Sequence, residues 1–283
     1  MKIRKLAYMV LFVIVCILVP VCGIVYFLPD RIMFHNVHCR ESREALQGMQ
    51  GYSEVAFTAE NGRTYHGVLR RAGEEKSPLV IYFGGNAEVS YRHMLMRENR
   101  DQWRHFEGYH YLFVDYPGYG LNDGRPHYLN MYEHALAVFD YAAVLPEVDS
   151  DRVVIMAFSI GTGGAVHLAA SRPVAGLILA TPYANGYDLY NNVIPVFYGP
   201  MRLLARQKFP NDEFAPNVSC PVLVIASQND EMVPFASSER LVGLFQGDVD
   251  FIELESERHN SVFDAEGVFD AVQGFLRLVL DGG

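Results

Sequence analysis

The stretch Val153-Val-Ile-Met-Ala-Phe-Ser-Ile-Gly-Thr-Gly-Gly-Ala165 decides the fold of this chain. It begins with an apolar run that predicts a buried strand, and it continues into small residues that are compatible with a helix. One serine, Ser159, stands where the two meet. In the pattern G-x-S-x-G a nucleophilic serine occupies the tip of a sharp strand-to-helix turn, where larger neighbours would collide. The stretch predicts such a turn at Ser159, although alanine replaces the first glycine at Ala157. A tight packing turn between a strand and a helix is the alternative.

Two loops downstream carry residues that could activate this serine. A serine hydroxyl becomes nucleophilic near neutral pH when a base takes its proton, and an acid orients that base. Asp230 follows the apolar strand pattern Pro221–Ala226, and His259 follows the pattern Val249–Leu254. Both are therefore expected past the carboxyl ends of strands, where a doubly wound sheet forms its ligand crevice. An exposed loop histidine and a turn-capping aspartate are the alternatives, but the chain order Ser, Asp, His favours a catalytic triad.

A glycine-rich segment upstream, Tyr82-Phe-Gly-Gly-Asn-Ala-Glu88, follows another apolar strand pattern. Backbone N–H groups in such a loop can stabilise the negative charge that develops on a reacting carbonyl oxygen. We predict Asn86 as one donor and Ile160, the residue after the nucleophile, as the other. An ordinary glycine turn is the alternative, and a phosphate-binding loop is disfavoured because the Lys-Ser/Thr pair is absent. A second glycine-rich segment, Asp115–Pro126, is predicted to shape the wall of the crevice.

Strand and helix patterns alternate along most of the chain. Ser53–Thr58 and Thr64–Arg70 flank an Asn-Gly turn and predict a hairpin. Six further strand patterns follow, at Leu79–Phe83, Tyr111–Val114, Val153–Phe158, Gly176–Ala180, Val222–Ala226 and Phe251–Leu254. Helical patterns follow or separate them, at Val89–Phe106, Met131–Leu145, Gly163–Ser171, Ser237–Phe245 and Phe263–Leu280. This order predicts an α/β fold with a mainly parallel, doubly wound sheet, an N-terminal hairpin and helices on both faces.

Residues 182–218 form the longest stretch without a clear strand pattern, and we predict that they form a small lid over the site. Its aromatic and apolar residues suggest an apolar acyl pocket, although they could equally belong to the core. The candidates are Tyr183, Tyr187, Tyr190, Val196, Phe197 and Tyr198.

Composition excludes several classes of protein. Of the 283 residues, 50% are hydrophobic and 20% are charged, which indicates a folded domain without long disorder. The formal net charge of −10 and the lack of a basic patch argue against nucleic acid as a partner. The cysteines have no zinc-like spacing, and the segment His35–Cys39 lacks a carboxylate companion, so no metal site is predicted. A bridge between Cys39 and Cys220 stays open at this point.

The N-terminus carries a run of 23 residues without a charge, Leu6–Leu28, preceded by Lys2, Arg4 and Lys5. At about 1.5 Å per residue a helix of this length can cross a hydrocarbon core of about 30 Å. We therefore predict a transmembrane anchor over residues 1–30 and one large α/β domain over residues 31–283. The basic residues place the N-terminus in the cytoplasm and the domain on the periplasmic or extracytoplasmic side. A cleaved signal peptide and a secreted protein are the alternative.

The motifs taken together resemble those of the α/β-hydrolase superfamily, over roughly residues 25 to 280. The resemblance is carried by Phe83-Gly-Gly-Asn-Ala-Glu88, Asp115-Tyr-Pro-Gly-Tyr-Gly120, Phe158-Ser-Ile-Gly161, Asp230-Glu-Met-Val-Pro234 and His259-Asn-Ser261. They are similar to the membrane-associated branch that includes bud-emergence-type hydrolases and protein depalmitoylases. That branch usually has His where this chain has Gly84, and Gly where it has Ala157. The resemblance implies hydrolysis of an ester, thioester or amide.

These observations predict a membrane-tethered serine hydrolase that cleaves a carboxylic ester or thioester through an acyl-enzyme on Ser159. His259 is expected to act as general base and then general acid, and Asp230 to orient it. The expected substrate is a small-molecule or lipid-like acyl compound, and no metal or organic cofactor is expected. An aminopeptidase-like amide hydrolase that binds a free amine at Asp188 or Glu213 is one alternative. A catalytically silent, membrane-anchored binding module is the other, and the intact triad counts against it.

Overall fold

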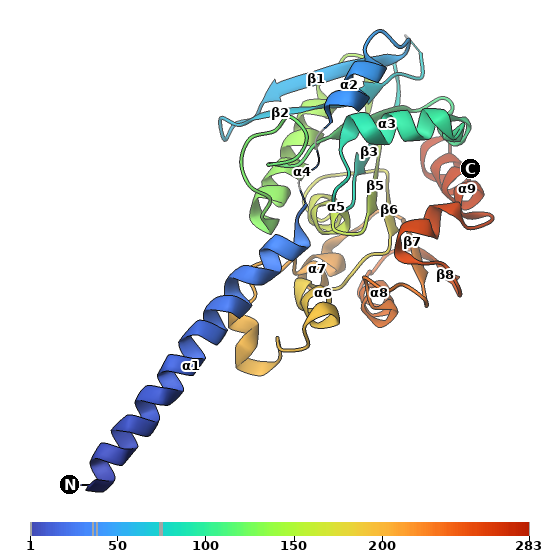
Figure 1. The fold of residues 1–283 in the computed structure, drawn as a ribbon. Helices are drawn as coiled ribbons and strands as arrows, with labels where there is room; N and C mark the ends of the chain where they lie inside the picture. Colours follow the sequence, from blue (N-terminus) through green and yellow to red (C-terminus); the bar gives the residue numbers. More distant parts are fainter. Residues whose placement is uncertain (1, 36, 38, 74–75, 283) are drawn as a thin grey trace.

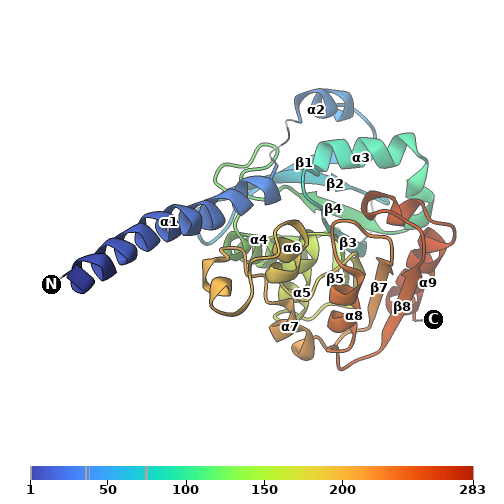
Figure 2. The ribbon, with the colours of Figure 1, turned by 60° about the horizontal axis from the view of Figure 1, so that its bottom comes forward.

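An eight-stranded sheet forms the centre of the molecule (Figures 1 and 2). The structure, a computed structural model, describes residues 2–35, 37, 39–73 and 76–282. Along the chain the strands are β1 (Tyr52–Thr58), β2 (Thr64–Arg70), β3 (Ser77–Phe83), β4 (His110–Val114), β5 (Val148–Phe158), β6 (Gly176–Ala180), β7 (Val222–Ser227) and β8 (Val249–Leu254). Their spatial order is β1-β2-β4-β3-β5-β6-β7-β8.

The pairing of the strands makes the sheet mixed but mainly parallel. The hairpin β1–β2 and the pair β2–β4 are antiparallel. All pairs from β4–β3 to β7–β8 are parallel. The predicted hairpin and the predicted parallel sheet are therefore confirmed. Strands β3 to β7 are almost wholly buried, as their continuous apolar sequences require.

Helices cover both faces of the sheet. They include α3 (Ser90–Asn99), α4 (Tyr128–Ala143), α5 (Gly161–Ala169), α8 (Phe235–Val242) and α9 (Val268–Leu280). Helices α4 and α5 pack against each other on one face, and α3 and α9 lie on the other (Figures 1 and 2). The structure thus has the doubly wound arrangement that the alternating patterns predict.

Two helical regions differ from the sequence prediction. The single helix expected over Val89–Phe106 is interrupted, because α3 ends at Asn99 and Asp101 adopts a left-handed φ of 53°. A left-handed residue cannot continue a right-handed helix, so a separate 3-10 helix, η1 (Gln102–Phe106), follows. A short helix, α2 (Arg40–Leu46), lies before the hairpin in a region for which no helix is predicted.

The segment between β6 and β7 consists of short helices, as its irregular sequence suggests. They are α6 (Gly186–Val193), η2 (Gly199–Leu204), α7 (Asn211–Phe214) and η3 (Ala215–Asn217). Tyr190, Phe197 and Ala205 form a small apolar cluster that is separate from the main core. Met33, from the end of the N-terminal helix, packs against this cluster. We refer to residues 182–218 as the lid.

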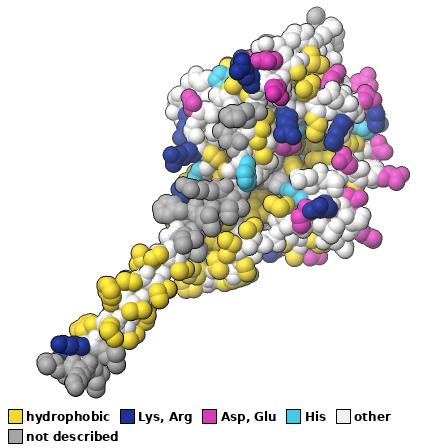
Figure 3. All heavy atoms as spheres, viewed as in Figure 1, with side chains coloured by type: hydrophobic (Ala, Val, Ile, Leu, Met, Phe, Trp, Pro, Cys, Tyr) yellow, Lys and Arg dark blue, Asp and Glu magenta, His cyan; other side chains and the backbone are white. Residues whose placement is uncertain are grey.

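The N-terminal helix α1 (Lys2–Met33) projects away from the body of the molecule (Figures 1 and 2). Many of its apolar side chains are exposed, among them Tyr8, Phe12 and Val19 at 70%, 67% and 64% (Figure 3). Of the helices in the described residues, none combines the length and the apolar character that a membrane span requires. The described structure thus does not support the transmembrane helix that the sequence predicts.

Two glycines allow a direct test of the packing. A Cβ atom on Gly67, in β2, would lie 2.3 Å from the carbonyl oxygen of Phe113 and 2.6 Å from the Cα atom of Val114. Gly274 lies in α9 with no heavy atom within 4 Å of such a Cβ. We expect Gly67→Ala to lower the free energy of unfolding by about 1–3 kcal/mol. Gly274→Ala should raise it by up to about 1 kcal/mol, because alanine is the better helix former. Urea denaturation measures both, and equal effects would contradict the strand packing.

Candidate active site

The turn at Ser159 joins β5 directly to α5. Ser159 has a φ of 52°, a left-handed conformation that non-glycine residues rarely adopt. Its N–H donates to the carbonyl of Ala180 at the end of β6, over 2.9 Å. Its own carbonyl accepts from the N–H and the hydroxyl of Thr162, over 3.0 and 2.7 Å. These bonds hold the strained residue and leave its hydroxyl at the carboxyl edge of the sheet.

The small residues around the serine are not equivalent. A Cβ atom on Gly161 would lie 2.3 Å from the carbonyl oxygen of Phe83 and 2.6 Å from that of Gly84, so this position requires glycine. Ala157 lies inside β5, in ordinary ladder pairing with Phe83 and Leu179. The backbone there accommodates a methyl group, which explains why alanine can replace the first glycine of the pattern.

Ser159, His259 and Asp230 form a continuous chain of hydrogen bonds. Nε2 of His259 lies 2.8 Å from Oγ of Ser159, and Nδ1 lies 2.8 Å from Oδ2 of Asp230. The second carboxylate oxygen, Oδ1, accepts from the N–H groups of Met232 and Val233, both over 2.8 Å. The side chains of His259 and Asp230 are only 6% and 2% exposed. The structure therefore brings together the three residues that the chain order suggests.

Hydrogen bonds between the two loops fix the relative position of the acid and the histidine. The hydroxyl of Ser227 donates to the carbonyl of Glu257 over 2.5 Å. The carboxylate of Glu231 accepts from the N–H of His259 over 3.1 Å and pairs with Arg258 over 2.8 Å. The hydrogen bond from the His259 N–H lowers the pKa of Glu231. Glu231 thus holds the backbone of the histidine loop, whereas its neighbour Asp230 contacts the imidazole.

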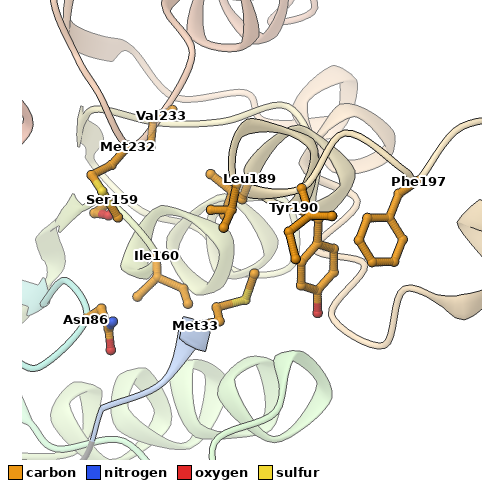
Figure 4. A pocket seen from close by; sticks show the side chains of 11 residues that line it. Met33, Asn86, Ser159, Ile160, Leu189, Tyr190, Phe197, Met232 and Val233 are labelled. Atoms are coloured by element: carbon orange, nitrogen blue, oxygen red, sulfur yellow. The ribbon is translucent and has the colours of Figure 1, made fainter. Parts of the chain in front are cut away.

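Both predicted oxyanion donors lie beside the serine. Asn86 and Ile160 line one pocket together with Ser159 (Figure 4). Among the residues that the structure describes, neither backbone N–H has a hydrogen-bond acceptor. Two N–H groups without internal partners next to a nucleophile can stabilise a developing oxyanion.

The second glycine-rich segment braces the loop that carries Asn86. The hydroxyl of Tyr116 donates to the carbonyl of Gly84 over 2.8 Å, and that of Tyr119 donates to Oδ1 of Asn86 over 2.9 Å. Asp115 is fully buried and accepts from the N–H and the hydroxyl of Ser90 at the start of α3, over 2.6 and 3.1 Å. The sequence predicts that this segment shapes the wall of the crevice. The structure shows in addition that Tyr116 and Tyr119 bond to the loop that carries Asn86.

A buried polar cluster occupies the space beside Gly84. A Cβ atom on Gly84 would lie 2.6 Å from the ring of Phe113 and 2.9 Å from a carboxylate oxygen of Glu88. Burial opposes ionisation of Glu88, but bonds from His93, Gly85 and Tyr82 outweigh it and lower its pKa. Burial lowers the pKa of His93 to about 4, so this histidine is neutral at physiological pH. The carboxylate of Glu88 thus occupies the space that a side chain at position 84 would need.

The pocket beside Ser159 is mostly apolar. Besides Asn86, Ser159 and Ile160, its lining consists of Met33, Leu189, Tyr190, Val193, Ile194, Phe197, Met232 and Val233 (Figure 4). Residues of the lid thus supply much of the wall. The sequence prediction did not include Met33, which comes from the end of α1.

Only some of the predicted pocket residues line it. Tyr190 and Phe197 do. Tyr183 is buried beneath, where its hydroxyl donates to the carbonyl of Ile160 over 3.1 Å. Tyr198 is 58% exposed, and Tyr187 packs against the small apolar cluster of the lid. Val196 packs against the same cluster.

Neither carboxylate considered for binding a free amine lines this pocket. Asp188 bonds to the hydroxyl of Ser237 and the guanidinium of Arg240. Glu213 is exposed on α7. The pocket next to the nucleophile therefore offers apolar contacts and no acidic side chain among its lining residues.

Neither cysteine considered for a disulfide lines this pocket. No cluster of three or more metal-binding side chains occurs in the described part of the chain. His38, in the segment with metal-like residue types, lies outside the described residues. Cys39 and Cys220 are both buried and both free, and burial raises the pKa of Cys220 to about 11.

Comparison with known proteins gives one family match and several relatives. The sequence model of the family described as "Serine hydrolase" matches residues 143–274. An uncharacterized protein of Mycobacterium tuberculosis is 31% identical over 201 residues, which cover 70% of this chain and 69% of that protein. The lysophosphatidylserine lipase ABHD12 of Danio rerio is 26% identical over 233 residues, covering 72% of this chain and 59% of that protein.

Solved structures share the fold at lower sequence identity. An acetyl xylan esterase from Paenibacillus sp. R4 matches with a TM-score of 0.67 and 17% identity, over 82% of this chain and 86% of that one. A Pyrococcus furiosus esterase matches with a TM-score of 0.66 and 16% identity, over 87% and 97%. These likenesses identify the arrangement of strands and helices.

The buried carboxyl of Asp115 predicts a dependence of stability on pH. Burial raises its pKa from 3.8 to about 7, so between these values the folded protein binds a proton that the unfolded chain releases. The stabilisation is complete below pH 3.8 and is lost as the pH rises through about 7. We expect the free energy of unfolding at pH 8 to be about 2–4 kcal/mol lower than at pH 4 on account of this group. Asp115→Asn should flatten the decline in urea titrations, and an unchanged decline would contradict this assignment.

Proposed function

Because the chain belongs to the serine hydrolases of the α/β-hydrolase superfamily, we propose that it hydrolyses carboxylic esters or thioesters through an acyl-enzyme on Ser159. The observation that carries this proposal is the chain of two 2.8 Å contacts from Asp230 through His259 to Ser159. A serine, a histidine and a buried carboxylate in this arrangement are suited to acyl transfer.

Each group has a role in the proposed mechanism. His259 takes the proton of Ser159 through Nε2 while Oγ attacks the substrate carbonyl. Asp230 accepts the hydrogen bond from the Nδ1–H group, fixes this tautomer and stabilises the imidazolium that forms. The N–H groups of Asn86 and Ile160 donate to the oxyanion of the tetrahedral intermediate. His259 then returns the proton to the leaving alcohol or thiol, and water releases the acyl group by the same steps.

The pocket favours an apolar acyl group as the substrate portion that is bound beside the serine. Its wall consists mainly of aliphatic and aromatic side chains from the lid, from Met33 and from Met232. Apolar surface of this kind binds small-molecule or lipid-like acyl chains through the hydrophobic effect. The relatives with named activities include a lysophosphatidylserine lipase and esterases, which are consistent with this substrate class.

The alternatives have less support. A peptidase that selects a free amine requires an acidic side chain near the site, but Asp188 is paired with Arg240 and Glu213 is exposed. A silent binding module has no need for the bonded Ser159, His259 and Asp230. We therefore favour ester or thioester hydrolysis.

The roles of the triad are tested by substitution. Ser159→Ala should lower kcat about 10⁴- to 10⁶-fold, because the nucleophile is lost, and should abolish labelling by a fluorophosphonate. Thermal unfolding should stay similar, since only one hydroxyl is removed. Equal labelling of wild type and Ser159→Ala would show that the nucleophile lies elsewhere.

The identity of the acid has a matched control in its neighbour. Asp230→Asn should lower kcat strongly, because the imidazole then loses its acceptor at Nδ1. Glu231→Gln should be milder, because Glu231 contacts the backbone N–H of His259 and not the ring. Hydrolysis of a short p-nitrophenyl ester measures both. If Glu231→Gln were the more damaging change, the acid would be assigned wrongly.

We further propose that α1 attaches the protein to a membrane, with the N-terminus cytoplasmic and the hydrolase domain on the opposite side. The proposal is supported by the uncharged run Leu6–Leu28, by the basic residues Arg4 and Lys5 before it and by the exposed apolar side chains on α1 (Figure 3). The alternative is that signal peptidase cleaves off the N-terminal segment and the protein is secreted.

Fractionation distinguishes these possibilities. The full-length protein is expected to pellet with membranes and to resist carbonate extraction, because transfer of this apolar run to water is costly. External protease should degrade the hydrolase domain once the outer barrier is opened. A mature N-terminus after about residue 22 would identify a signal peptide, and protection from protease would reverse the orientation.

A further inference from the structure

We infer that the segment directly after α1 belongs to the active site, where His35 positions the oxyanion loop by holding the side chain of Asn86. The inference rests on the proposed function, because it assigns a role in that reaction to a residue outside the triad. His35 lies 51 positions before Asn86 in the chain, and two hydrogen bonds join them. His35 is a positioning residue, since it acts through Asn86.

The two bonds form a ring that fixes the amide of Asn86. The backbone N–H of His35 donates to Oδ1 of Asn86 over 2.9 Å, and Nδ2 of Asn86 lies 3.0 Å from Nδ1 of His35. A backbone N–H can only donate, so the atom that faces it must be Oδ1. Nδ2 then points at the imidazole, and Nδ1 of His35 must be the acceptor. The contact thus corresponds to the tautomer of His35 that carries its hydrogen on Nε2.

A third bond holds the same amide from another segment. The hydroxyl of Tyr119 donates to Oδ1 of Asn86 over 2.9 Å. The next residue, Ala87, has a left-handed φ of 62°, which is strained for alanine. The loop therefore adopts an unfavourable backbone conformation and depends on bonds from outside itself. His35 and Tyr119 supply such bonds to the side chain of Asn86, whose backbone N–H is the proposed oxyanion donor.

The same short segment also contributes to the substrate pocket. Met33, two residues before His35, projects from the end of α1 toward Ile160 and Leu189 (Figure 4). The short segment from Met33 to His35 therefore lines the pocket at one end and bonds to Asn86, the proposed oxyanion donor, at the other. The end of α1 and the oxyanion loop are therefore in contact through Met33 and His35.

This arrangement predicts an effect on the chemical step rather than on substrate binding. The Asn86 N–H interacts with the oxyanion, which exists only in the transition state and the intermediate. Loosening the loop should therefore lower kcat and leave KM for a short, soluble ester nearly unchanged. A purely structural role for His35 would instead lower stability without separating kcat from KM.

The experiment compares His35→Ala with His35→Asn in the full-length protein. Alanine removes the acceptor, whereas the Oδ1 atom of asparagine lies the same number of bonds from the backbone as Nδ1 of histidine. We expect His35→Ala to lower kcat about tenfold, the change that the loss of one hydrogen bond typically causes, with KM changed by less than about twofold. His35→Asn should restore most of the activity. Arg40→Ala, at a side chain that is 90% exposed on α2, serves as the matched control and should match wild type.

Three further measurements distinguish a positioning role of His35 from a role in folding. A trifluoromethyl ketone forms a tetrahedral adduct with an oxyanion, so its inhibition constant should rise about tenfold in His35→Ala, in parallel with the loss of kcat. Asn86→Ala should be no worse in the His35→Ala background than alone, because the two residues act as one unit. Melting temperatures should agree within a few degrees.

Several outcomes would overturn the inference. It fails if His35→Ala retains full kcat, if His35→Asn is as damaging as His35→Ala, or if the effects of the two alanine substitutions add. In these cases wild type still hydrolyses the ester and is labelled by a fluorophosphonate, so the proposed function stands. A wild-type protein that is neither active nor labelled would instead contradict the proposed function, and this inference with it.

Discussion

The left-handed conformation of Ser159 is the constraint on which the rest of the site depends. Its φ of 52° is unfavourable for a residue with a side chain, and it persists because bonds to β6 and α5 hold it on both sides. The close approach of Gly161 to the carbonyls of Phe83 and Gly84 brings α5 against β3. Asn86, on the loop after β3, and Ile160, at the start of α5, thereby line one pocket with Ser159.

The sheet converts positions that are distant in sequence into neighbours. β5, β7 and β8 are parallel, so Ser159, Asp230 and His259 all follow strand ends at one edge. Bonds between the loops then hold the acid and the base. The ring of Phe158 packs 5.0 Å from that of His259 and limits its movement. The polar base of the pocket is thus held by hydrogen bonds and ring packing, whereas its apolar walls come mainly from the lid and from Met33.

Sequence patterns predicted the features that depend on local order along the chain. Strands β3 to β7 contain continuous apolar runs, and each site residue lies in the turn or loop after a predicted strand, so Ser159, Asp230 and His259 could be predicted without coordinates. The break at Asp101 could not, because its left-handed conformation leaves no mark in the hydrophobic pattern. Met33 and His35 were missed for another reason. They lie at the end of α1 and just after it, far from the other site residues in the chain, and their contacts with the site follow no sequence periodicity.

The central claim is that a substrate acyl group is transferred to Ser159 and is held there until water attacks. The most direct measurement is rapid acid quenching during turnover of a p-nitrophenyl ester, followed by mass spectrometry of the intact protein and of its peptides. We predict one added acyl mass on the peptide that contains Ser159, together with a burst of p-nitrophenol equal to the enzyme present. Turnover without an acylated protein, or an acyl group mapped to another residue, would contradict the account.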